Sequence, residues 1–108
     1  MDYNEINENI LGVLQGLKKR PGMYFRGEQT YLTYETFLWG YLTGLSAIAS
    51  VGDITAWFTE KRGESNYSIL FSAQILHLYP GNSEEEHIKI LLDTVEGYFH
   101  ENPLVKRG

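Results

Sequence analysis

Apolar residues recur every three or four positions at the start of the chain, which is the spacing of one face of an α-helix. The stripe consists of Ile6, Ile10, Val13, Leu14 and Leu17. Acidic residues precede the stripe and a run of three cations, residues 18–20, follows it, as the helix macrodipole favours. Pro21 and Gly22 then end the segment, so the pattern predicts a helix over residues 4–19.

The same spacing returns near the end of the chain, after a specific start signal. Ser83 and Glu86 have the spacing of a capping box, in which each side chain bonds the backbone amide of the other residue. The stripe that follows consists of Ile88, Leu91, Leu92, Val95 and Phe99. These features predict a helix over residues 83–101.

A third stripe begins after Thr30, a residue suited to an N-cap, and predicts a helix over residues 31–50. Its many large apolar residues suggest that this helix is the central one of the fold. Residues 36–52 carry no charge, and Gly40 and Gly44 have GxxxG spacing, so a membrane span is an alternative. The 17 uncharged residues fall short of the roughly 20 that a bilayer requires, and four Ser and Thr residues interrupt them. Burial inside a helical bundle is favoured, with the two glycines allowing a neighbouring helix to approach closely.

Two shorter segments lie between these helices. Ile54, Trp57 and Phe58 indicate a helix over residues 53–62, after the break at Gly52. Residues 66–79 are ambiguous, because their apolar positions fit both a strand and a helix. No second alternating segment exists to pair with a strand, so a helix is favoured. The 108 residues are therefore predicted to form one domain, residues 1–108, of the all-α class: a compact bundle of about five helices.

Composition narrows the function classes. The chain has no cysteine, which excludes disulfides, thiolate zinc sites and cysteine nucleophiles. Fourteen acidic residues against nine Lys and Arg give a net charge of −5, which argues against general affinity for nucleic acid or anionic membranes. The first five residues are polar and acidic, unlike a secretory signal, so we expect a cytoplasmic location.

Catalytic and metal-binding patterns are missing. His77, His87 and His100 lack the spacing that puts two imidazoles on one helix face, and no phosphate-binding loop or nucleophile elbow occurs. We therefore expect no enzyme activity, no metal and no cofactor.

The string Arg20-Pro21-Gly22-Met23-Tyr24 resembles the segment after the first helix in the ATPase domain of type II topoisomerases. That domain also needs a strand-rich sheet, a magnesium-binding Asn and a glycine-rich lid, which this chain does not show. The string is better explained as a helix stop in which Met23, Tyr24 and Phe25 fold back onto the apolar stripe. A binding role for Arg20, Tyr24 or Arg26 is the alternative.

The overall layout is similar to that of small bacterial immunity proteins of contact-dependent growth inhibition and other polymorphic toxin systems. The similarity rests mainly on residues 18–25 and 37–42 and on the order of the helices, of which the last is Glu-rich. It implies a protein that neutralises a cognate toxin C-terminal domain, a basic nuclease, delivered by a neighbouring cell. Carboxylates suit a basic cleft, and aromatic side chains such as Tyr67 and Tyr79 suit an interface. The candidate partner-binding residues are Glu60, Glu64, Tyr67, Glu84, Glu85, Glu86, Asp93 and Glu96.

Two alternatives stay open at this point. The acidic residues also fit solvated helix faces with no partner. The chain also fits a non-catalytic adaptor or scaffold that self-associates through its aromatic-rich second helix, at Trp39, Tyr41 and Gly44. As a toxin inhibitor it would be a monomer or a weak dimer.

Overall fold

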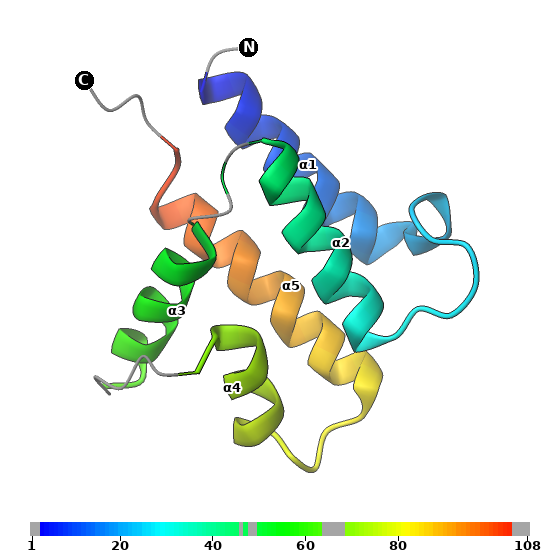
Figure 1. The fold of residues 1–108 in the computed structure, drawn as a ribbon, viewed down its shortest axis with the longest axis vertical. Coiled ribbons are helices and arrows are strands. Elements are labelled where there is room, and N and C mark those ends of the chain that lie inside the picture. Colours follow the sequence, from blue (N-terminus) through cyan, green and yellow to red (C-terminus); the bar gives the residue numbers. More distant parts are fainter. Residues whose placement is uncertain (1–2, 46, 48–49, 64–68, 105–108) are drawn as a thin grey trace.

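A computed structural model describes residues 3–45, 47, 50–63 and 69–104. These residues form five α-helices and one short 3-10 helix, and the described part contains no strand, which confirms the all-α class (Figure 1). The elements in chain order are α1 (Tyr3–Lys19), η1 (Pro21–Met23), α2 (Tyr31–Gly44), α3 (Ser50–Lys61), α4 (Phe71–Leu78) and α5 (Glu84–Glu101). No helix in the described ranges is long and apolar enough to cross a membrane.

Helix α5 is the centre of the fold, and the expectation that the second helix would be central is wrong. α5 packs against α1, α2, α3 and α4. Its inner face contributes Leu91, Leu92, Val95 and Phe99, all nearly inaccessible to solvent. The reason is positional, because α5 runs across the bundle and gives every other helix an apolar stripe to cover (Figure 1).

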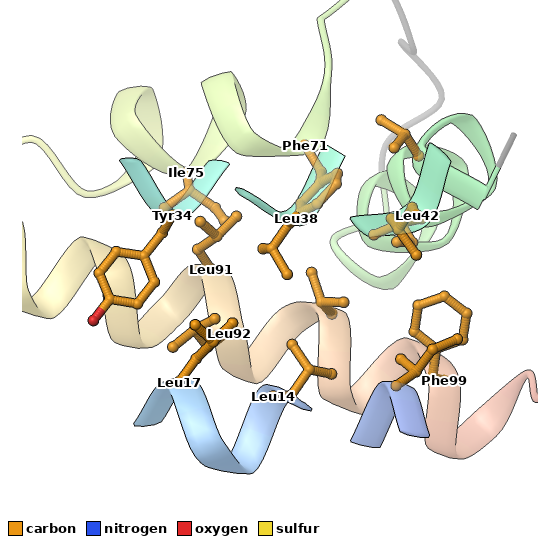
Figure 2. Close-up of a cluster of buried hydrophobic side chains, with 14 of the residues drawn as sticks. Leu14, Leu17, Tyr34, Leu38, Leu42, Phe71, Ile75, Leu91, Leu92 and Phe99 are labelled. Atoms are coloured by element: carbon orange, nitrogen blue, oxygen red, sulfur yellow. The ribbon is translucent and has the colours of Figure 1, made fainter. Parts of the chain in front are cut away.

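The core joins all five helices (Figure 2). Leu14 and Leu17 come from α1, Leu38 and Leu42 from α2, and Phe71 from α4. Each of these side chains is at most 3% exposed. Close packing of these groups provides the main stabilisation of a domain of this size.

The boundary between α2 and α3 differs from the prediction. α2 ends at Gly44 rather than near residue 50, and α3 begins at Ser50 rather than at residue 53. The Ala47 amide donates to the Leu42 carbonyl at 2.7 Å. This bond gives a carbonyl at the end of α2 a partner without extending the helix. Gly52, expected to mark a break, lies inside α3, and Asp53 lies in the first turn of this helix, where the helix dipole favours a carboxylate.

Helix α4 begins later than predicted. Residues 66–68 of the predicted helix lie outside the described ranges, and the helix starts only at Phe71. The Phe71 amide donates to the Thr55 hydroxyl of α3 at 3.1 Å, so a contact with another helix sets this start. The amides of Ala73 and Gln74 then bond the Leu70 carbonyl.

The predicted role of the GxxxG glycines is also wrong. A Cβ added to Gly40 or Gly44 would meet no described atom within 4 Å, so neither glycine receives a neighbouring helix. The close approach occurs at Gly16 of α1, where an added Cβ would overlap the ring of Tyr24. The Tyr24 ring therefore packs back against α1, at Gly16 rather than on the apolar stripe. Met23 does not fold back and is 74% exposed, and Phe25 packs against Tyr34 of α2 instead.

Candidate protein-binding surface

Three glutamates at the start of α5 are positioned by its capping box. The Ser83 hydroxyl accepts from the Glu86 amide at 3.2 Å, and the Glu86 carboxylate accepts from the Ser83 amide at 2.9 Å. These bonds lower the pKa of Glu86, since they favour its charged form. Glu84 accepts from the Tyr31 amide at 3.2 Å, which ties the starts of α5 and α2 together. Glu85 is exposed and makes no hydrogen bond or ion pair within the described part of the chain.

The three glutamates line a groove of about 680 Å³ between the end of α1, η1, the start of α2 and α5. We call it the acidic groove. Its apolar lining combines the core residues Leu17, Tyr34 and Leu92 with Pro21 and Ile88. Gln29, Lys18 and Lys89 complete the lining. The groove thus offers an apolar floor with carboxylates at its edge, a common arrangement in protein interfaces.

Asp93 and Glu96 lie further along α5 and are already paired with α1. The Lys18 ammonium lies 2.6 Å from Asp93 and 3.2 Å from Glu96. The Gln15 amide also donates to Glu96. Partial burial by itself lowers the pKa of Lys18, but the two carboxylates outweigh burial and raise it. These two acids hold α1 against α5, and a partner would have to compete with Lys18 for them.

The other predicted residues do not join this group. Glu60 is exposed on α3, which lies across the molecule from the start of α5 (Figure 1). Glu64 and Tyr67 lie outside the described residues. Tyr79 is 39% exposed and follows α4, and its carbonyl bonds the His87 ring at 2.6 Å.

Sequence reasoning missed the apolar floor and the edge formed by η1. Leu17 and Leu92 were assigned only to helix stripes, and Pro21 only to a helix stop. No local signal places Pro21 and Glu84 in one groove, since this depends on how the end of α1 packs against α5. The capping box was the one local signal that pointed to this end of α5.

The self-association residues predicted on the second helix are partly used inside the molecule. Trp39 packs against Phe71 of α4, with ring centroids 5.7 Å apart. Tyr41 is half-buried beside Phe37, and Gly44 is exposed. Only part of this predicted surface is therefore open to a second copy.

Buried polar groups elsewhere have a structural role. Thr59, which is fully buried on α3, accepts a hydrogen bond from the Gln74 amide of α4 at 3.0 Å. The Arg62 guanidinium donates to the side-chain oxygen of the same Gln74. The Tyr31 hydroxyl donates to the Ser72 carbonyl at 2.6 Å, and burial raises the pKa of Tyr31. Among the described residues, no group of three His, Asp or Glu side chains is arranged to hold a metal.

Comparison with known proteins adds no relative. No protein-family model matches the chain, and neither a curated protein nor a solved structure matches it significantly. The similarity to immunity proteins therefore stays a prediction from the residues quoted above.

Proposed function

We propose that this protein is a non-catalytic inhibitor of the immunity-protein kind, which acts in the cytoplasm by binding a basic toxin domain through the acidic groove. The observation that carries the proposal is the carboxylate of Glu85, which has no partner within the described ranges and lies beside Glu84 and Glu86 at the edge of an apolar floor. The similarity of the sequence to immunity proteins supplies the class of partner.

The physical argument combines charge with shape. A nuclease binds its polyanionic substrate through a basic cleft, so carboxylates that enter this cleft both attract the toxin and exclude the nucleic acid. A standard interface takes about 800 Å² from each partner, which is about an eighth of the 6741 Å² surface of this chain.

The experiment is co-expression with the toxin domain encoded immediately upstream, followed by purification of a complex and an assay of toxicity. We expect a stable complex and loss of toxicity. Glu85→Lys should slow association on the order of tenfold at low ionic strength, and added salt should reduce the difference.

Glu8→Lys is the matched control, because it makes the same charge change at an exposed site in the first half of α1. It should leave the association rate close to that of the unmodified protein. Equal rates for both variants at low salt would move the contact surface away from the acidic groove. Failure to form any complex would remove the toxin as the partner.

A further inference from the structure

Three cations without partners surround the turn after α1. Lys19, Arg20 and Arg26 are exposed, and within the described residues none of their side chains makes a hydrogen bond or an ion pair. The other described cations all have partners: Lys18 and Lys89 bind Asp93, Lys61 binds Glu101, and Arg62 binds Gln74. On a chain with a net charge of −5, the unpaired cations of the described ranges are gathered at one place, which we call the basic turn (residues 19–26).

The basic turn is rigidly held. The amides of Tyr24 and Phe25 both bond the Pro21 carbonyl, at 2.9 and 3.1 Å. The Tyr24 ring covers Gly16 and meets the ring of Phe37 edge-on, with centroids 5.6 Å apart. Phe25 packs edge-on against Tyr34 of α2 at 4.8 Å. Ordering this turn in a complex therefore costs little, since its backbone is already fixed.

The basic turn also exposes one large apolar side chain. Met23 is 74% exposed, the highest value among the large apolar residues described. Arg20 and Lys19 flank it, and all three line a small hollow beside Gly16. Methionine is flexible and polarizable, so it adapts well to an apolar groove on a partner.

The acidic groove has the complementary properties. Its edge carries Glu84, Glu85 and Glu86 opposite the apolar floor, whereas the basic turn carries three cations around an apolar side chain. Pro21 belongs to the basic turn and also lines the groove, so the two features adjoin on one side of the molecule. Figure 1 shows η1 and the loop after it projecting on the side where α5 begins.

We infer that this side of the molecule is an interface with a second copy of the chain, in which the basic turn of each copy occupies the acidic groove of the other. A two-fold interface uses one patch on both copies, so it must contain both of the complementary features, and these two features adjoin. Long-range repulsion between two chains of charge −5 opposes the contact, which favours a weak dimer held by local charge pairs. The inference does not rest on the proposed function, although a toxin in the acidic groove would compete with the second copy.

The test measures the mass of the full chain by sedimentation equilibrium over a range of concentrations, at about 0.05 M and about 0.5 M salt. We expect a monomer–dimer equilibrium at low salt whose dissociation constant rises by about tenfold or more at high salt. Glu85→Lys and Arg20→Glu should each weaken dimerisation at low salt by a similar factor. Met23→Ala should weaken it as well, whereas Leu32→Ala, at another exposed apolar residue, should not.

Mixing the two charge variants gives the decisive result. In a mixed dimer, one contact pairs Arg20 with Glu85 as in the natural protein, and the other pairs the two reversed charges. An equimolar mixture of Glu85→Lys and Arg20→Glu should therefore dimerise more tightly than either variant does by itself. Circular dichroism of each variant checks that the helices are retained.

Two results overturn the inference. A protein that is monomeric at low salt up to millimolar concentration has no such interface. A dimer that resists both high salt and the charge reversals is held elsewhere, such as at the uncharged exposed face of α4, and mixing would then restore nothing. Neither result bears on whether the toxin binds, so failure here is separate from failure of the proposed function.

Discussion

The pair α1 and α5 and the pair α3 and α4 are held together in different ways. α1 and α5 are long, with 17 and 18 residues, and they meet along apolar stripes flanked by ion pairs from Lys18. α4 has 8 residues and contains no Asp, Glu, Lys or Arg, and buried hydrogen bonds join it to α3. A periodic apolar stripe therefore makes a long helix predictable from its own sequence, whereas a short helix depends on partners far along the chain.

Loss of the Phe71 ring tests whether α4 belongs to the same cooperative core as α1 and α5. Phe71 is fully buried and packs against Trp39 of α2 and Phe58 of α3. Phe71→Ala should lower the free energy of unfolding by about 3–5 kcal/mol, because it leaves a large cavity. Leu14→Ala, at an equally buried site between α1 and α5, should cost about 2–5 kcal/mol.

Urea unfolding followed by circular dichroism measures both changes. Each variant should retain one transition with a lower midpoint. If Phe71→Ala left the midpoint unchanged while Leu14→Ala lowered it, α4 would be an appendage to the core rather than part of it.

The buried hydroxyl of Thr59 tests the polar connection between α3 and α4. It donates to Thr55 within its own helix and accepts from Gln74 across the interface. Thr59→Val should lower the free energy of unfolding by about 1–2 kcal/mol, because it removes a partner of a buried amide. The same experiment on Thr94→Val is the control, since among the described residues the Thr94 hydroxyl bonds only the Ile90 carbonyl of its own helix.

The two threonine variants should therefore differ by about 1 kcal/mol. Equal costs in urea unfolding would mean that the bond between Thr59 and Gln74 contributes nothing beyond the loss of a helical hydroxyl. The α3 and α4 pair would then be held by apolar contacts and by the bond from the Phe71 amide to Thr55.

The same contrast explains how far the sequence predicted the fold. The bounds of α1 and α5 were predicted to within a residue, because their stripes and caps are local features. The predicted start of α4 was wrong, because the actual start depends on a bond from the Phe71 amide to Thr55, 16 residues earlier. The early end of α2 was missed for a similar reason, since the helical stripe continues past Gly44 and only the backbone contacts after it show the break.

The candidate surface was predictable to a lesser extent. Glu84, Glu85 and Glu86 were identified because a capping box places them together at one helix end. The sequence does not show which of the three glutamates accept hydrogen bonds, because the bond from the Tyr31 amide to Glu84 joins residues 53 positions apart. Likewise, the sequence does not show that Asp93 and Glu96 are engaged by Lys18, 75 and 78 positions away.

Lys18 provides the test with the smallest expected effect, on the ion pairs between α1 and α5. Lys18→Met should lower the free energy of unfolding at neutral pH by about 0.5–1 kcal/mol, since the pairs with Asp93 and Glu96 are only partly shielded from water. Lys89→Met is the control and should cost less, because Lys89 is 79% exposed and lies 3.8 Å from Asp93.

Since the pKa of Lys18 is raised in the folded protein, its contribution to the free energy of unfolding is complete below the ordinary lysine pKa of 10.5 and is lost as the pH rises through the folded value. Urea unfolding at neutral pH and at about pH 11 should therefore show the gap between the natural protein and Lys18→Met narrowing at high pH. A gap that is absent at neutral pH, or that widens with alkali, would show that the apolar stripes alone join α1 to α5.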